Sequence, residues 1–281
     1  MGFVGAGRIG FPMVSRLVGA GHRVQVVFRS REARTALTEE GALPCPEVVD
    51  VAAGAETVVV CVYDDEQVRE VVLDSGLLDA MPTGSVLVVH TTGSPATIAR
   101  LVERAGRRGI EVVDAPVSGG PHDVAAGHVT LYAGGTEEGM ARARPVMSVY
   151  GLPIVHCGPP GSGQLVKLVN NAVFAANIGV VAAAVRLANQ LGIEENLVVT
   201  GLQHGSAASR VLDGIAVRAS VAAYAHNVGE FVGKDVAVVR GVAAGLGADL
   251  GLLADAHRVL GDLLSPEQRV QLIGFPEAVR S

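Results

Sequence analysis

The chain has 281 residues, of which 49% are hydrophobic and 18% are charged, and its formal net charge is −6. This length suits two domains better than one, and the apolar share can fill a large core. The negative charge argues against a general nucleic-acid or anionic-membrane binder, so we expect a small-molecule partner, no nucleic acid and no membrane.

Short Val- and Ile-rich runs alternate with helical patterns in the first half of the chain, which is typical of βαβ units and a parallel sheet. The expected strands are Phe3–Val4, Val24–Phe28, Thr57–Val62, Ser85–Val89, Glu111–Asp114, Val129–Ala133 and Ile154–His156. The expected helices are Phe11–Gly19, Glu32–Glu40, Asp65–Leu73 and Ala96–Gly106. Ser94-Pro95 marks the start of the last one, because Ser caps helical amides and Pro suits the first helical position.

The pattern changes at Gly158-Pro159-Pro160-Gly161-Ser162-Gly163, which is dense in structure breakers. We therefore expect one domain over residues 1–160 and a second, all-helical domain over residues 161–281. Its predicted helices are Gln164–Leu191, Glu195–Gln203, Ser209–Ala223, Val228–Ala244 and Leu252–Leu264, with a short last one from Ser265-Pro266-Glu267. Gly192 is expected as a left-handed cap of the first.

Between Lys167 and Arg186 the chain has 18 residues without a charge, which is near membrane-spanning length. The run is rich in Ala and contains Asn170, Asn171 and Asn177, so we expect a helix buried between protein surfaces. Such a helix is too apolar to be solvated on a broad face, and it predicts packing against the first domain and a second subunit. We therefore predict a homodimer or homotetramer.

Three cysteines, Cys45, Cys61 and Cys157, show neither CxxC nor Cys/His ligand spacing. They are interpreted as small core residues in a reducing compartment, so we expect a cytoplasmic protein without a metal site. We expect no secretory signal, because Gly5–Gly10 interrupts the first apolar run.

The run Gly5-Ala6-Gly7-Arg8-Ile9-Gly10 follows a short strand and opens a helix, the context that a dinucleotide fingerprint requires. Gly5 permits a tight turn, Gly7 lets the backbone approach a pyrophosphate, and Gly10 allows the helix to pack on the strand. The helix amides then face the phosphates. We therefore predict an α/β fold: an N-terminal Rossmann-type dinucleotide-binding domain, followed by an all-α C-terminal domain with a long interdomain helix.

The second strand ends in Val27-Phe28-Arg29-Ser30-Arg31, with no carboxylate before Glu32. Sites for NAD usually place an acidic residue here, whereas Arg29 and Arg31 can pair with a 2′-phosphate and Ser30 can donate a hydrogen bond. NADP is the predicted cofactor and NAD stays possible. The alternative is a pair of solvated turn arginines.

Lys167 and Asn171 are spaced i, i+4, which places both on one face of a helix about one turn apart. Hydride delivery to a carbonyl builds charge on its oxygen, and a protonated lysine can supply the proton. Asn171 can orient the oxygen by a neutral hydrogen bond. Backbone amides at Ser118, Gly119 and Gly120 can converge on a carboxylate, because glycine removes the Cβ barrier.

The chain resembles the β-hydroxyacid dehydrogenase family over essentially its whole length. The resemblance is carried, in order, by GAGRIGFPM, by HTTGSP from His90, by DAPVSGG from Asp114, by GSGQLVKLVNN from Gly161, and by Gly233-Lys234-Asp235. It implies that Lys167 is the catalytic acid/base and that Asn171 orients the substrate. It also implies substrate contacts at Ser118, Gly119, Gly120 and Asn170, and cofactor contacts at Val62, Tyr63, Thr92 and Lys234.

The chain departs from the family pattern at four places, which puts the substrate in doubt more than the reaction. Asp123-Val124 stands where members commonly have Gly-Ala, and His128, Val89 and Phe28 replace other common residues. The leading hypothesis is an NADP-dependent oxidoreductase that interconverts a small β-hydroxy acid and its semialdehyde. The alternatives are an imine reductase-like enzyme, whose relatives generally lack the lysine, and a non-catalytic NADP-binding module.

Overall fold

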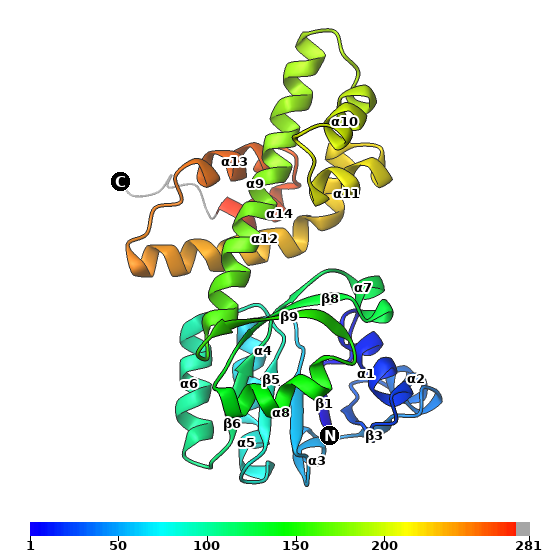
Figure 1. Ribbon diagram of the computed structural model, residues 1–281, viewed down its shortest axis with the longest axis vertical. Coiled ribbons are helices and arrows are strands. Elements are labelled where there is room, and N and C mark those ends of the chain that lie inside the picture. The colour runs from blue at the N-terminus through cyan, green and yellow to red at the C-terminus, as the bar shows by residue number, and fades with distance from the viewer. Residues whose placement is uncertain (274–281) are drawn as a thin grey trace. The chain divides into compact units, whose positions relative to one another are not determined.

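The structure is a computed structural model that describes residues 1–273. The chain divides into two compact units, Met1–Lys167 and Leu168–Ser281, and the division falls inside the long helix α9 (Figure 1).

The first unit is built on one nine-stranded sheet with the order β3-β2-β1-β4-β5-β6-β8-β7, in which β9 pairs with β8. All pairs from β3 to β6 are parallel, while β8 is antiparallel to β6 and β7. The strands are β1 (Gly2–Val4), β2 (Gln25–Val27), β3 (Leu43–Cys45), β4 (Thr57–Val60), β5 (Val86–Val89), β6 (Glu111–Asp114), β7 (Val117–Ser118), β8 (Val129–Gly134) and β9 (Gly151–Gly158). The predicted parallel sheet is confirmed.

Helices cover both faces of this sheet. They are α1 (Gly10–Gly19), α2 (Arg31–Glu39), α3 (Val48–Ala52), α4 (Asp65–Arg69), the π-helix η1 (Glu70–Asp74), α5 (Leu77–Ala80), α6 (Pro95–Gly106), α7 (Pro121–Ala126) and α8 (Glu137–Met147). Successive strand residues point to opposite faces, so Phe3 joins a core with α1, α2, α7 and α8, while Val4 joins a core with α3 to α6. This explains why β5 is apolar at every position and β4 at every position but Thr57.

The second unit is helical and comprises most of α9 (Ser162–Gln190) with α10 (Glu195–His204), α11 (Arg210–Arg218), α12 (Val221–Leu246), α13 (Leu252–Gly261) and α14 (Pro266–Ile273). Its core brings Ile178 of α9 together with Ile215 of α11 and Val236 of α12. A Cβ on Gly179 would lie 2.0 Å from the carbonyl oxygen of Ala256, so only glycine permits this approach of α9 to α13. The predicted all-helical half is confirmed as far as residue 273.

The predicted break between helices Ser209–Ala223 and Val228–Ala244 is misplaced. Helix α11 stops at Arg218, and α12 already begins at Val221. Ala219 adopts a left-handed φ of 57°, and Ser220 then caps the new helix by accepting a hydrogen bond from the Ala223 amide. A cap within a run of Ala and Val lacks the Gly or Pro that usually marks a helix end.

Among the described residues, α9 is the one helix long and apolar enough to cross a membrane by length and composition, with a mean hydropathy of 1.8. More than half of that window is buried inside the protein, and core helices of soluble proteins pass the same test. The helix is therefore weak evidence for a membrane span.

Candidate active site

The loops after four neighbouring parallel strands gather at one edge of the sheet in the first unit. The chain runs from β1 outward to β2 and β3 and then returns to β4 on the other side of β1. Ligands of such sheets bind outside the carboxyl ends of the strands, where this reversal occurs. The loops at that edge are Gly5–Gly10, Arg29–Arg31, Val62–Tyr63 and Thr91–Ser94.

The glycines of the first loop meet the demands of a dinucleotide site. A Cβ on Gly5, whose φ is +100°, would lie 2.2 Å from the Cys61 carbonyl oxygen, and one on Gly10 would lie 2.1 Å from that of Gly5. A Cβ on Gly7 would instead enter open space. No side chain caps the first amides of α1, so they stay available to a phosphate. The loop therefore fits a dinucleotide pyrophosphate, with Ala6, Arg8 and Ile9 completing it.

Arg29 and Arg31 lie exposed between β2 and α2, and neither forms an ion pair with a residue that the structure describes. Ser30 caps α2 by accepting a hydrogen bond from the Ala33 amide at 3.1 Å. The pKa of the Glu32 carboxyl is lowered, first by its own backbone N–H and then by the Ser30 hydroxyl. Two free guanidiniums thus lie beside one carboxylate, and the Ser30 hydroxyl already faces that carboxylate.

The Thr91 hydroxyl joins the loops after β4 and β5. It donates to the Val62 carbonyl at 2.9 Å and accepts from the Val62 amide at 3.1 Å. Tyr63 follows with 41% of its side chain exposed. The hydroxyl of Thr92 has no partner among residues 1–273, so it is available to a ligand.

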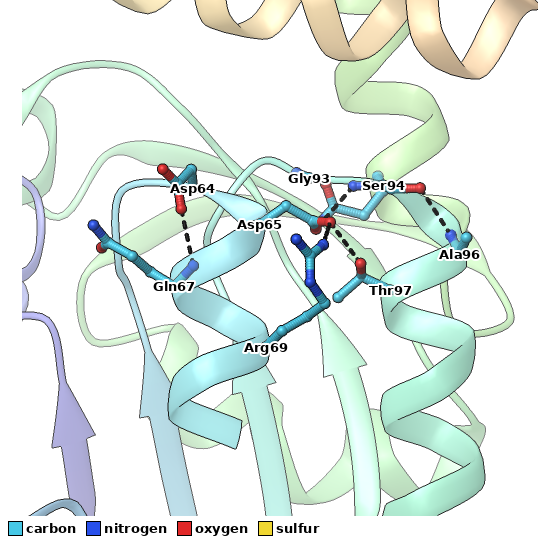
Figure 2. Close-up of polar contacts among 9 residues, drawn as sticks. Asp64, Asp65, Gln67, Arg69, Gly93, Ser94, Ala96 and Thr97 are labelled. Atoms are coloured by element: carbon cyan, nitrogen blue, oxygen red, sulfur yellow. Dashed lines mark hydrogen bonds and ion pairs between the residues drawn. The ribbon is translucent and has the colours of Figure 1, made fainter. Parts of the chain in front are cut away.

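Asp65, at the start of α4, binds the start of α6 (Figure 2). Its Oδ1 accepts the Ser94 amide at 3.1 Å, and its Oδ2 accepts the Thr97 hydroxyl at 2.5 Å and pairs with Arg69 Nη1 at 2.7 Å. A Cβ on Gly93 would lie 2.2 Å from Oδ1, so the loop needs glycine there. Asp65 therefore fixes the end of the loop that carries Thr92.

Gln164, in the first turn of α9, holds the other side of the same loop. Its Oε1 accepts the Gly93 amide at 2.9 Å, and its Nε2 donates to the Thr91 carbonyl at 2.8 Å. The buried side-chain amide of Gln164 therefore fixes the backbone on both sides of Thr92.

Asp114, at the end of β6, holds the first turn of α9. Its Oδ1 accepts the Gly161 amide at 2.6 Å and its Oδ2 accepts the Gln164 amide at 2.7 Å. The carboxylate is completely buried; burial raises its pKa to about 6, and these backbone amides oppose the rise. The helix start that leads to Lys167 is therefore tied to the sheet.

Lys167 and Asn171 both lie on α9 and are both buried, with 8% and 7% of each residue exposed. In the second unit, Asn171 Nδ2 donates to Asp235 Oδ2 of α12, and Asn170 Nδ2 donates to Asn171 Oδ1 at 3.0 Å. Lys234 Nζ forms an ion pair with Asp235 Oδ1 at 2.9 Å, and both side chains are mostly buried. This ion pair is therefore largely shielded from solvent.

The loop Ser118–Gly120 connects β7 to α7, and Gly119 has a φ of +139°. The Gly120 amide donates to Asp123 Oδ2 at 2.6 Å. One of the amides that could hold a substrate carboxylate is thus bonded to a carboxylate of the protein itself.

Behind the Thr91 loop, His90 is buried against Tyr150. Its Nδ1 lies 2.6 Å from the Ala115 carbonyl, so this nitrogen carries the proton, and its Nε2 then accepts from the Tyr150 hydroxyl at 2.8 Å. Burial lowers the pKa of His90 to about 4. A neutral histidine therefore supports the chain next to the Asp114-Ala115-Pro116 turn.

Within the first unit the structure brings together the predicted cofactor residues of four loops, and within the second it brings together Asn170, Asn171 and Lys234. The sequence interpretation did not identify Asp65, Asp114 or Gln164 as supporting residues. Asp114 stood in the DAPVSGG motif and Gln164 in GSGQLVKLVNN, so the motifs were the available signal. Residues 1–273 contain no group of three His, Cys, Asp or Glu side chains suited to a metal ion.

The fold and the glycine loop define a dinucleotide-binding protein. The family model described as the NAD binding domain of 6-phosphogluconate dehydrogenase matches residues 1–158. A second, described as the NAD-binding domain of NADP-dependent 3-hydroxyisobutyrate dehydrogenase, matches residues 161–268. The chain belongs to the β-hydroxyacid dehydrogenase family.

Two proteins of Pseudomonas aeruginosa are similar to this chain. It is 36% identical to a 3-hydroxyisobutyrate dehydrogenase over 196 residues, which are 69% of this chain and 64% of that protein. It is 31% identical to an NAD-dependent L-serine dehydrogenase over 75% of this chain and 71% of that protein. The solved structure of Mycobacterium tuberculosis 3-hydroxyisobutyrate dehydrogenase with L-serine has a TM-score of 0.81, with 27% identity, over 93% of this chain and 92% of that one.

Proposed function

We propose that the protein is an NADP-dependent oxidoreductase that interconverts a small β-hydroxy acid and its semialdehyde or oxo form, with Lys167 as acid/base. A bound nicotinamide supplies the hydride donor or acceptor. In the reduction direction, Lys167 gives a proton from Nζ to the substrate oxygen, and Asn171 donates a hydrogen bond to that oxygen. In the oxidation direction Lys167 takes the hydroxyl proton.

The observation that carries this proposal is a buried lysine on a helix whose first turn is held by Asp114 and Gln164. Lys167 is 8% exposed. Fixing the helix start limits the positions that the amine can take, which is what proton transfer to a reacting oxygen requires. The same lysine is the argument against an imine reductase-like enzyme.

Two free guanidiniums support NADP as the cofactor. Arg29 and Arg31 can pair with a 2′-phosphate, and the position where NAD sites usually have a carboxylate holds neither Asp nor Glu until Glu32. One matching family model is described as NADP-dependent and one relative as NAD-dependent, so these matches leave both cofactors open. Our choice of NADP therefore rests on the two arginines.

An uncovered apolar stripe on α9 supports a homodimer or homotetramer. Val169, Val173, Val180 and Leu187 are each more than 40% exposed and recur at spacings that share one helical face. We propose that a second copy covers them, and that the protein is cytoplasmic, in keeping with its three free cysteines. A solution mass of one 28.7 kDa chain would contradict the oligomer.

The proposal is tested by incubating the protein with NADPH and a panel of small semialdehydes, oxo acids and imines, and with NADP and small hydroxy acids. We expect carbonyl reduction that falls at least 100-fold in Lys167→Ala. Arg186→Ala, which removes an exposed charge from the same helix, should retain activity. Turnover of imines alone would support the imine reductase alternative, and NADPH binding without turnover would support a non-catalytic module.

A further inference from the structure

The two glycines of the loop after β7 lie against an acidic side chain. The Gly120 amide donates to Asp123 Oδ2 at 2.6 Å, and the same oxygen would lie 2.8 Å from a Cβ on Gly119. Asp123 belongs to α7, and its side chain keeps 36% of its surface exposed. A negative charge therefore faces the Ser118–Gly120 loop, which the sequence predicts to bind the substrate carboxylate.

This charge changes what the loop can bind. A substrate carboxylate that accepts the Gly120 amide would share one N–H with Asp123. Two carboxylates that accept the same N–H lie close enough to repel each other. His122 Nε2 lies 3.4 Å from the second oxygen, Oδ1, but 85% of its side chain is exposed. An exposed pair of this kind offsets little of the charge. A substrate that brings only a carboxylate is thus disfavoured.

We propose that Asp123 makes this site select β-hydroxy acids that carry an ammonium group beside the carboxylate over those that carry the carboxylate alone. The inference rests on the proposed function. An ammonium group cancels the net charge of the substrate and supplies N–H donors, and Asp123 can accept one of them through a charge-assisted hydrogen bond.

L-Serine and 3-hydroxyisobutyrate form a matched pair of probes, because one carries an ammonium where the other carries a methyl group. Oxidation of either removes a hydride from the carbon that bears the hydroxyl, to NADP, and the hydroxyl proton, to Lys167. The reacting end of the two molecules is therefore the same, and a difference in kcat/KM reports on the neighbouring group.

Asp123→Asn separates the charge from the hydrogen bond. The asparagine oxygen can still accept the Gly120 amide, so the start of α7 keeps its partner while the charge is lost. We expect the ratio of kcat/KM for L-serine over 3-hydroxyisobutyrate to fall about tenfold in Asp123→Asn. Glu137→Gln, the same change at an exposed position of α8, should leave the ratio unchanged.

A binding measurement makes the result independent of turnover. Calorimetric titration of propionate into the protein with NADP bound should show about tenfold tighter binding in Asp123→Asn than in the unchanged protein. If both the substrate ratio and the propionate affinity are the same in the two proteins, the inference is overturned. If neither substrate is turned over, the proposed function fails, and the propionate titration alone then supports or overturns the role of Asp123.

Discussion

Asp114 accepts the backbone amide of Gln164 at 2.7 Å, across 50 residues of sequence, and so joins the end of β6 to the first turn of α9. Its other oxygen accepts the Gly161 amide. The position of Lys167, three residues after Gln164, therefore depends on a carboxylate at the end of β6.

Replacing Asp114 by Asn should therefore destabilise the protein and slow the reaction. Each carboxylate oxygen has its own N–H partner, so the asparagine NH₂ must face one of these donors. Leaving a buried amide unpaired should cost about 2 kcal/mol of unfolding free energy. Urea unfolding and kcat with NADPH check this, with Asp74→Asn, an exposed carboxylate, as the control. A variant as stable and as active as the unchanged protein would contradict the role of Asp114.

Asp65→Asn should weaken the Thr91–Ser94 loop without disturbing α4. One oxygen of Asp65 serves Thr97 and Arg69 and the other serves Ser94, and an amide cannot replace all three acceptor contacts. We expect the KM for NADPH to rise about tenfold while the unfolding free energy changes by less than about 1 kcal/mol.

Asp64→Asn is a matched control for this prediction, because Asp64 caps α4 through the Gln67 amide at 2.9 Å (Figure 2). Asparagine caps a helix as well as aspartate does. Equal effects of the two substitutions on KM would show that the charge at this helix start matters and the link to Ser94 does not.

The sheet could be predicted from the sequence more fully than the smaller elements. Strands β4 and β5 are buried at all four positions and are apolar at every one except Thr57, and such runs carry a strong signal. Strand β7 has only two residues and α5 only four, so neither shows a period that can be recognised. Strand β7 forms by pairing with β8, and α5 packs in the core with α3 and η1.

For the candidate site, the role of residues within motifs could be predicted from the sequence. The residues that hold the motif loops in place by hydrogen bonds could not. The spacing of Gly5, Gly7 and Gly10 is enough to predict their role in a dinucleotide-binding loop. Gln164 instead acts on Gly93 across 71 residues, and no local pattern reports a contact of that separation. The sequence shows Asp123 as a departure from the family pattern, but only the structure shows that it accepts the Gly120 amide.

Asp235→Asn tests the orientation of Asn171. The ionised Asp235 only accepts hydrogen bonds, so it requires the NH₂ group of Asn171 on its side and leaves the amide oxygen to Asn170. An asparagine at position 235 permits both orientations. We expect kcat to fall about tenfold with a smaller change in the KM for NADPH. Asp255→Asn, which breaks an exposed ion pair with Arg258, should change neither.

The choice of cofactor can be tested at the end of β2. Combining Arg29→Ala with Arg31→Ala should raise the KM for NADPH about 100-fold and leave that for NADH within about threefold, because only NADPH has the 2′-phosphate. Arg23→Ala, two residues before the other end of β2, is the control. Equal losses with both cofactors would show that the two arginines bind no 2′-phosphate.

The pH dependence of stability should carry the signature of the buried His90. Its pKa is about 4 in the folded protein against 6.5 for the unfolded chain, so protons bind the unfolded state first. The stability that His90 contributes is therefore present above pH 6.5 and is lost as the pH falls from 6.5 toward 4, by about 3 kcal/mol. Burial raises the pKa of Asp114 to about 6, so this carboxyl adds a slope of the opposite sign below pH 6. The difference in unfolding free energy between the unchanged protein and His90→Asn isolates the His90 slope. His90→Asn keeps a donor for the Ala115 carbonyl but does not titrate, so its unfolding free energy should lack this slope. Urea unfolding at several pH values checks this, with the exposed His122→Asn following the unchanged protein. A difference between the unchanged protein and His90→Asn that does not vary with pH would contradict the role of His90.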